Sequence, residues 1–357
     1  PKQFFSALYA NPNFKEEPMS GGRQMGAHFF TPSINPRGEW LDLTCQFNHS
    51  SDISPTAGQI PRSIGLALAS KIYRNIDSDI KNKFTVGGNE ICWATIGNAS
   101  TSQGIFFEAM NAAAVIQIPL IMSVWDDGYG ISVDNKIQTV KSSISEALMG
   151  FSSKNKDKPL KIFRVNGWDY SKMIEVYGEA EKIARKDHTP VLIHVDELTQ
   201  PLGHSSSGSH QRYKSEERLN WEKEFDCNVK FKQWIIENNL GTQNELKEIE
   251  ESCIKIVRES KDKAWESYQK PIIDLNLELI GMLNKILISS NNDVNLKIWI
   301  ENLKSKKEYI YKDLLNVANK TVRKFRKTNN KDLIVLKNWI KNLHEILQPK
   351  FNSHLYS

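Results

Sequence analysis

Four stretches of the chain are almost continuously apolar, and segments with a helical pattern separate them. The apolar stretches are CWATIG (92–97), PLIMSVW (119–125), KIFRVN (161–166) and VLIHVDE (191–197). Such runs are typical of parallel strands that are covered on both faces. Helical patterns precede and separate these runs, over residues 59–73, 103–116, 142–151 and 170–186. The alternation predicts an α/β fold with a doubly wound parallel sheet.

The pattern changes in the last part of the chain. Residues 215–348 have helical periodicity and no convincing strand, as in LNLELIGMLNKIL and IVLKNWIKNLHEIL. Apolar residues at three- and four-residue spacing form a stripe that must pack on a neighbouring surface. The segments 289–293 and 327–331 are rich in Asn, Ser and Lys and predict turns between helices. We therefore expect a helical extension after the α/β part.

Composition narrows the class of protein. The chain has 357 residues, of which 39% are hydrophobic and 25% charged, as in a globular protein of one or two domains. No apolar run approaches the roughly 18 residues that a membrane-spanning helix needs. The first residues, Pro1-Lys2-Gln3, include no initiator Met and no signal-like apolar core, which suggests a processed chain or part of a longer one. Four scattered cysteines form no CxxC pair, so we expect neither a zinc site nor a redox pair, and a cytoplasmic location.

Positive charge is concentrated at the end of the chain. Residues 301–357 contain 13 Lys and Arg and 5 Asp and Glu, a balance of +8, while the whole chain carries +5. A basic tail can contact nucleic acid, or it can simply be the solvated surface of helices. No nucleic-acid motif accompanies it, so no nucleic-acid partner is expected.

Polar residues follow two of the apolar runs, where each predicted strand ends. Gly97 and Asn98 follow the first run, and Asp126 and Asp127 follow the second. Ligands of an open parallel sheet bind beyond the carboxyl ends of its strands. A helix beginning near Gln103 would offer N–H groups to a phosphate, and the Asn98 and Asp127 oxygens suit a hard cation. This corner predicts a magnesium-bridged diphosphate; the alternative is an ordinary strand–loop–helix connection with polar caps.

Several segments, taken in order, resemble a known family. The stretch from Gly97 to Asp127 resembles the thiamine-diphosphate motif, which begins GDG and ends NN about thirty residues later. The wider chain resembles the alpha chain of the first component of 2-oxo acid dehydrogenase complexes, of the branched-chain type in which alpha and beta chains are fused. The segments that carry this resemblance are GGRQMGAHF (21–29), SPTAGQIPRSIG (54–65), IGNASTSQG (96–104), FFEAMNAA (106–113), VWDDGYGIS (124–132) and GHSSSGSHQRY (203–213).

The resemblance implies a sheet of the thiamine-diphosphate-binding type and assigns its site residues. Asn98, Asp127 and the carbonyl of Tyr129 would hold magnesium. A potassium ion would lie in the loop of Ser54, Pro55 and Gln59. The residues assigned to the cofactor are Ser54, Thr56, Gly97, Asn98, Ala99, Ser100, Asp127, Tyr129 and Ile131.

The sequence departs from the family motif at the metal ligands. The family acid is Asn98 here and the family asparagine is Asp127, so one formal negative charge is kept, and Asp126 can add another. We expect magnesium to bind either oxygen; the alternative is a decayed site. Trp125 stands where the family often has an arginine on the diphosphate, so that charge is missing or comes from elsewhere.

Histidines supply the candidate acid–base groups. His204 aligns with the loop histidine that hydrogen-bonds the substrate or its adduct, and imidazole exchanges protons near neutrality. His28 matches another active-site loop position, where contact with substrate and no contact with it stay equally open. His210 is expected to order the loop that follows His204. Ser205–Ser207 resembles a loop that is phosphorylated in mitochondrial relatives, which we do not expect here, and Gly208 replaces an aspartate of the family.

The resemblance implies oxidative decarboxylation of a 2-oxo acid, proposed as branched-chain, with acyl transfer to a lipoyl group. The implied partners are a beta subunit or beta half, which supplies the activating glutamate, and a lipoyl-bearing acyltransferase, in an α2β2-type assembly. A Tyr-Arg segment that binds the diphosphate in the family would precede Pro1. We therefore expect a catalytically incomplete alpha half, divided into residues 1–214, 215–270 and a connector over 271–357. The rivals are a transketolase-like enzyme and a non-catalytic assembly module with a degenerate cofactor site.

Overall fold

The computed structural model describes residues 1–24, 28–77, 79–152, 160–204 and 209–352. The chain divides into two compact units. Unit 1 contains residues 1–32, 49–51 and 249–357, and unit 2 contains residues 33–48 and 52–248. The expected division after residue 214 falls inside unit 2, and the one after residue 270 falls inside unit 1. Each unit is described by itself.

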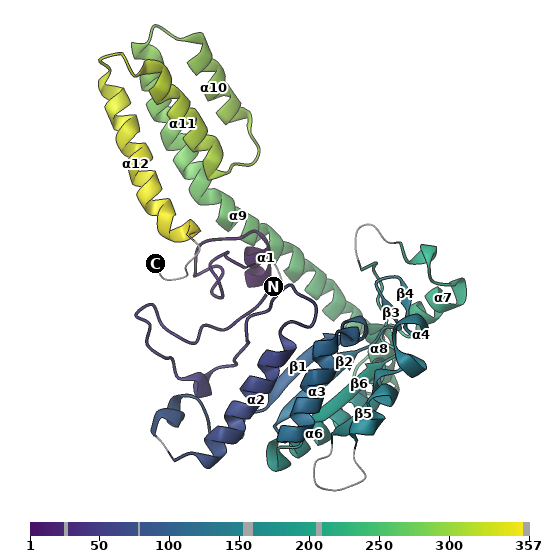
Figure 1. Cartoon of the computed structure of the whole chain (residues 1–357). Coiled ribbons are helices and arrows are strands. Elements are labelled where there is room, and N and C mark those ends of the chain that lie inside the picture. The colour runs from purple at the N-terminus through teal and green to yellow at the C-terminus, as the bar shows by residue number, and fades with distance from the viewer. Residues whose placement is uncertain (25–27, 78, 153–159, 205–208, 353–357) are drawn as a thin grey trace. The chain divides into compact units, whose positions relative to one another are not determined.

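Unit 2 is built on a parallel four-stranded sheet (Figure 1). Its strands are β1 (Cys92–Gly97), β2 (Leu120–Trp125), β5 (Lys161–Asn166) and β6 (Val191–Asp196). Their order in the sheet is β1-β2-β6-β5, and every neighbouring pair is parallel. The four apolar runs therefore form strands within one residue of the expected bounds. Gly97 pairs in register with Trp125, so β1 and β2 end at the same edge of the sheet.

Helices cover both faces of this sheet. Alternate residues of β2 belong to two different apolar clusters, because successive side chains of a strand point to opposite faces. Leu120, Met122 and Val124 pack in the cluster that contains α2 (Ile60–Asn75) and α3 (Gly104–Ile116). Ile121 packs in the cluster that contains α6 (Tyr170–Asp187). The expected doubly wound α/β arrangement is confirmed.

One expected helix is broken. Residues 142–151 form two short pieces, α5 (Ile144–Ala147) and the 3₁₀ helix η5 (Met149–Phe151), so the expectation of one continuous helix was wrong. The side chain of Ser143 caps α5 by accepting the N–H of Glu146. Leu148 then leaves the helical region, with ψ near 4°, and ends α5 after one turn. Serine competes with helical backbone bonds, so it favours a start at this point over continuation.

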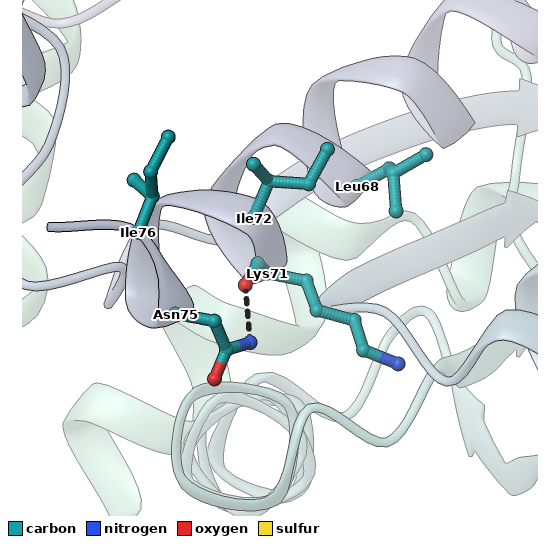
Figure 2. Close-up of a pocket in the computed structure, with 5 residues that line it drawn as sticks. All are labelled: Leu68, Lys71, Ile72, Asn75 and Ile76. Carbon is teal, nitrogen blue, oxygen red and sulfur yellow. Dashed lines mark hydrogen bonds between the residues drawn. The ribbon is translucent and has the colours of Figure 1, made fainter.

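A hollow on the surface of unit 2 lies along the C-terminal half of α2 and is lined by Leu68, Lys71, Ile72, Asn75 and Ile76 (Figure 2). These residues lie away from the strand ends in sequence. The other elements of unit 2 are η1 (Leu43–Cys45), η2 (Asp79–Lys83), η3 (Asn98–Ser102), β3 (Tyr129–Gly130), β4 (Val133–Asp134), α4 (Asn135–Gln138), η4 (Val140–Ser142), η6 (His210–Arg212), α7 (Glu216–Glu224) and α8 (Cys227–Glu237).

Unit 1 is helical where the sequence predicts a helical extension. It contains α1 (Lys2–Leu8), most of α9 (Gln243–Ser289), α10 (Val294–Ser305), α11 (Tyr311–Phe325) and α12 (Lys331–Phe351). The stripes of α9 to α12 meet in one core that includes Leu279, Ile300, Leu314 and Leu336. Across the described residues, no helix is both long and apolar enough to cross a bilayer.

Candidate functional site at the carboxyl edge of the sheet

The first wall of the candidate site is the connection from β1 to α3. β1 ends at Gly97, η3 runs over Asn98–Ser102, and α3 begins at Gly104. Neither η3 nor α3 has a side chain that caps its N-terminus, and a Cβ added at Gly97 or Gly104 would meet nothing within 4 Å. Uncapped N–H groups beside open space are the arrangement that favours a bound phosphate.

The second wall is the turn that follows β2. Asp126 Oδ1 accepts the N–H of Gly128 at 2.8 Å, and Asp127 Oδ1 accepts the N–H of Tyr129 at 3.1 Å. Gly128 has φ of 85°, a left-handed conformation that glycine adopts without strain. The two aspartates therefore shape the turn that brings the Tyr129 carbonyl back toward η3.

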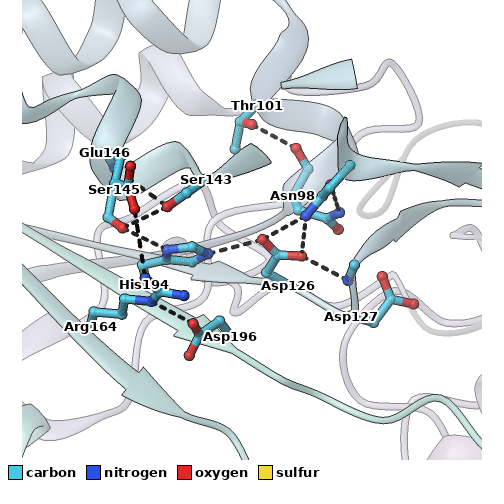
Figure 3. Close-up of polar contacts among 12 residues, drawn as sticks. Asn98, Thr101, Asp126, Asp127, Ser143, Ser145, Glu146, Arg164, His194 and Asp196 are labelled. Carbon is cyan, nitrogen blue, oxygen red and sulfur yellow. Dashed lines mark hydrogen bonds and ion pairs between the residues drawn. The ribbon is translucent and has the colours of Figure 1, made fainter. Parts of the chain in front are cut away.

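Asn98 joins the two walls directly. Its Nδ2 donates to the Tyr129 carbonyl oxygen at 3.0 Å and to Asn135 Oδ1 at 2.7 Å. Asn98 is only 6% exposed. No hydrogen bond joins the side chains of Asn98 and Asp127 within the part of the chain that the structure describes, and Figure 3 shows the Asp127 carboxylate pointing away from the Asn98 amide. Asn98 thus points a hydrogen-bond donor, not an oxygen, toward the Tyr129 carbonyl. From the sequence, these two groups are expected to bind the same magnesium ion.

A row of buried polar side chains continues from Asn98 into the sheet. Asn135 Nδ2 donates to the two carboxylate oxygens of Asp126 at 2.7 and 2.9 Å. The other Asp126 partner is His194 Nε2, at 2.9 Å, and His194 Nδ1 lies 2.8 Å from Ser145 Oγ (Figure 3). We call Ser145, His194, Asp126, Asn135 and Asn98 the buried polar chain. All five are at most 9% exposed, so their hydrogen bonds are screened from water.

Positive charge near this corner comes from the segment that ends in α7. Lys214 Nζ lies 2.7 Å from Glu222 Oε1 and 4.9 Å from the centre of the Tyr129 ring. Arg218 donates to the same carboxylate at 2.9 Å and to the Asp127 carbonyl at 2.8 Å. Burial raises the pKa of Asp127, while the Tyr129 N–H and the charge of Lys214 act in the opposite direction. Two cations therefore lie near this corner, on a different segment from Trp125, and both pair with Glu222.

Ala99 and Ser100 occupy the first turn of η3, as the cofactor assignment requires, and both are half-buried. Gln138 fixes this turn from α4, because its Nε2 donates to the Ala99 carbonyl at 2.9 Å. Ile131, the first residue of the β3–β4 turn, is 58% exposed with φ of 58°. The structure thus brings Gly97, Asn98, Ala99, Ser100, Asp127 and Tyr129 to one edge of the sheet.

Replacing Gly130 with alanine is expected to destabilise this corner by about 1–3 kcal/mol, the range for forcing an extra methyl into a packed site. The new Cβ would lie 2.4 Å from Gln138 Oε1 and 2.9 Å from the Ala99 side chain. Thermal unfolding measures the effect. Gly104→Ala is the matched control, since its Cβ meets nothing within 4 Å. Equal losses for the two variants would contradict the close approach of Gly130 to η3.

The loop before α2 contains the other residues assigned to the cofactor. Ser54 and Thr56 are both exposed, and Gln59 is the N-terminal cap residue of α2. Gln59 Oε1 is buried and has no hydrogen-bond partner within the described residues. A buried carbonyl oxygen without a donor is costly, and a cation is one way to satisfy it.

The candidate acid–base residues lie in different parts of the chain. His204 is exposed in the loop after β6, and Ser205–Ser207 and Gly208 lie outside the described residues. His28 is half-buried and belongs to unit 1. His210 is 7% exposed, and the centres of its ring and of the Tyr213 ring lie 5.7 Å apart. Trp125 is 54% exposed, and its indole N–H donates to Ser123.

Sequence reasoning missed part of the site. It assigned no role to Asn135, Gln138, His194, Lys214 or Arg218. The one sequence signal was the four-residue spacing of Arg218 and Glu222, typical of an ion pair on a helix. That spacing does not reveal which strand end the pair faces.

Comparisons with known proteins identify the family to which the chain is similar. The profile of the family described as "Dehydrogenase E1 component" matches residues 45–273. The chain is 28% identical over 202 residues to a pyruvate dehydrogenase E1 component subunit alpha of Rickettsia bellii, covering 57% of this chain and 55% of that protein. It is 27% identical over 249 residues to the 2-oxoisovalerate dehydrogenase subunit alpha of Bacillus subtilis, covering 70% and 65%.

The chain spans about half the length of the pyruvate dehydrogenase relatives that it matches. Among solved structures, a transketolase from Campylobacter jejuni matches 63% of this chain and 33% of its own, with 20% identity and a TM-score of 0.34.

Proposed function

Because the chain belongs to the dehydrogenase E1 component family, we propose that it is the alpha half of a thiamine-diphosphate-dependent 2-oxo acid dehydrogenase that transfers acyl groups to a lipoyl group. One observation carries this proposal. Within the family match, the edge where β1 and β2 end combines uncapped N-termini, open space beside two glycines and an oxygen-rich turn.

The diphosphate fits this edge. The N–H groups of Ala99 and Ser100 would hold it at the start of η3, and Gly97 leaves room for its approach. Ser54, Thr56 and Ile131 would flank the rest of the cofactor. Bound thiamine diphosphate supplies the carbon nucleophile and the electron sink that decarboxylation requires. The chain itself contributes binding, orientation and a field shaped by Lys214 and Arg218.

Magnesium and potassium are assigned to different residues. For magnesium we assign Asp127 and the Tyr129 carbonyl. Asn98 does not fit as a ligand in the orientation it has, because its N–H2 group faces Tyr129. For potassium we assign Gln59, whose buried Oε1 has no donor among the described residues, with Ser54 in the same loop.

Proton movement falls to His204 in this proposal, with His28 as a second candidate. The His204 imidazole is exposed in the loop after β6. His204→Asn tests the role, because asparagine keeps a hydrogen bond but cannot exchange a proton. Both residues act only once the partner half completes the site.

The proposed substrate is a branched-chain 2-oxo acid, as the name of the Bacillus subtilis relative suggests. The name of the Rickettsia bellii relative points to pyruvate instead. Assays of the reconstituted enzyme with 2-oxoisovalerate, pyruvate and 2-oxoglutarate distinguish the alternatives. A preference for pyruvate overturns the branched-chain assignment and leaves the reaction type intact.

The proposed assembly joins this chain to a beta subunit or beta half, in an α2β2-type arrangement, and to a lipoyl-bearing acyltransferase. Residues 271–357 would form the connector to the beta part. All four cysteines carry free thiols, which accords with the cytoplasmic location that we propose.

A second candidate is a non-catalytic assembly module with a degenerate cofactor site. The hydrogen bond from Asn98 to the Tyr129 carbonyl favours it, because this contact removes one expected metal ligand. In this case the fold and partner surfaces would be retained without cofactor binding.

Calorimetry separates the two candidates. The chain, together with its beta half, is titrated with thiamine diphosphate in the presence and absence of magnesium. The enzyme proposal expects micromolar to submillimolar binding, and Ser100→Asp is expected to weaken it at least about tenfold, or 1.4 kcal/mol, through repulsion of the diphosphate. Ser171→Asp, the same change in the first turn of α6, is the matched control. Absence of binding at millimolar cofactor supports the assembly module.

A further inference from the structure

The direction of every hydrogen bond in the buried polar chain follows from the Asp126 carboxylate. A carboxylate has only acceptor oxygens, and Oδ1 already takes the Gly128 N–H at 2.8 Å. Asn135 must therefore turn its N–H2 group toward Asp126, which leaves its Oδ1 facing Asn98. Asn98 in turn must present its N–H2 group, whose second hydrogen reaches the Tyr129 carbonyl. Amide orientation is here determined by connectivity.

We propose that Asp126 is a positioning residue: acting through Asn135, it fixes the Asn98 side chain with its N–H2 group toward the Tyr129 carbonyl. The amide at position 98 and the carboxylate at position 126 can then be exchanged together but not one at a time. The amide N–H2 group occupies the point where a divalent cation would bridge residue 98 and the Tyr129 carbonyl. Asn98 is accordingly not a metal ligand in this chain. The inference concerns side-chain orientation alone and does not depend on cofactor binding.

The single variant N98D breaks the arrangement. A carboxylate oxygen in place of the amide nitrogen would lie 2.7 Å from Asn135 Oδ1 and 3.0 Å from the Tyr129 carbonyl oxygen, with no hydrogen between any of these atoms. Buried acceptors that face one another are strongly unfavourable. D126N disturbs the other end. Oδ1 of residue 126 can still accept from Asn135, but the new amide nitrogen at the Oδ2 position faces Asn135 Nδ2 at 2.9 Å, donor against donor.

The double variant N98D/D126N reverses the whole chain. The Gly128 N–H keeps an oxygen at the Oδ1 position, so the new amide nitrogen of residue 126 takes the place of Oδ2. From there it donates to Asn135, which turns over and donates to residue 98. It also faces His194 Nε2, 2.9 Å from the present Oδ2, so His194 must move its proton to Nδ1 and donate to Ser145.

Reversal leaves two acceptor pairs without a hydrogen between them. In one, Asn135 Oδ1 faces Oδ1 of residue 126, 2.7 Å apart at the present positions, so the Asn135 amide must tilt toward the new Nδ2. The other pair is a cation site. The new carboxylate at position 98 would face the Tyr129 carbonyl across about 3 Å. Oxygens that are neighbours on an octahedral magnesium ion are also about 3 Å apart, given Mg–O distances of about 2.1 Å. The double variant should thus bind magnesium through residue 98 as well, and more tightly without cofactor than the natural chain, whose assigned ligands are Asp127 and the Tyr129 carbonyl alone.

Thermal unfolding of the full chain without cofactor tests the exchange. In EDTA each single variant is expected to lower the Tm by about 4–8 °C, and the double variant by less than either single one. About 10 mM MgCl₂ should raise the Tm of the double variant by about 2–5 °C and leave the natural chain within about 1 °C. If N98D does not fold, recovery in the double variant remains the deciding measurement.

Nitrogen-15 NMR of histidine provides a readout that simple repacking would not change. The His194 signals should show the Nε2–H tautomer in the natural chain and the Nδ1–H tautomer in the double variant. D134N is the matched control, because it makes the same charge change at the exposed cap of α4, where asparagine caps as well as aspartate. D134N should lower the Tm only slightly, and its effect on the Tm should add to that of N98D.

Two results would overturn the proposal. The losses of N98D and D126N could simply add in the double variant, with the Nε2–H tautomer kept. Alternatively, magnesium could stabilise the natural chain as much as the double variant, which would show that the ion gains nothing from a carboxylate at position 98. Neither result depends on thiamine diphosphate, so a failure of the enzyme proposal is observed separately.

Discussion

Glu222→Leu is expected to destabilise unit 2 by about 3–5 kcal/mol, the range for leaving a buried charge without its partner. Glu222 has 6% of its side chain exposed and accepts hydrogen bonds from Lys214 and Arg218. The Lys214 side chain is only 1% exposed, so water cannot replace the lost carboxylate. Chemical denaturation measures the loss. Because Lys214 and Arg218 flank Tyr129 and Asp127, diphosphate affinity should fall as well.

Two further variants define the cause of this loss. Lys214→Met combined with Glu222→Leu removes both charges and should recover most of the stability, since apolar pairs often replace buried ion pairs at little cost. Glu224→Leu, two residues along α7, is the matched control; its carboxylate is 67% exposed and 3.7 Å from Lys230. Its effect should stay within about 0.5 kcal/mol. A double variant no more stable than Glu222→Leu would refute the explanation by an unpaired charge.

Phe106→Ala is expected to cost about 3–5 kcal/mol, because it removes a large buried side chain and leaves a cavity. Phe106 is 0% exposed and lies on α3, in the cluster that includes Leu120, Met122 and Val124 of β2. The same helix begins at the proposed diphosphate corner. Unfolding measurements should show the full loss, and hydrogen exchange should show faster opening of η3 and the first turn of α3.

Val115→Ala is the control on the same helix, since Val115 is 53% exposed. It should change stability by less than about 0.5 kcal/mol. If Phe106→Ala were equally mild, α3 would not be anchored on the sheet through this residue, and the rigidity assigned to the corner would lose its support.

Most of the α/β scaffold was predictable because its signals are local. A strand buried on both faces reads as an apolar run, and β1 and β5 have the bounds that their runs predict. The break between α5 and η5 was not predictable, because residues 142–151 keep a helical pattern while the Ser143 cap and Leu148 interrupt it. Periodicity reports which face is apolar and does not report where the backbone changes direction.

The sequence by itself determined that β1 and β2 end on Gly97-Asn98 and Asp126-Asp127, and that parallel pairing brings those ends to one edge. Only the tertiary structure decided which group each side chain presents there. Asn98, Asn135, Asp126, His194 and Ser145 come from separate segments, and a hydrogen bond depends on where those segments meet. Residue identity sets the available donors and acceptors, whereas their direction is a property of the assembled network, and here one buried carboxylate sets it.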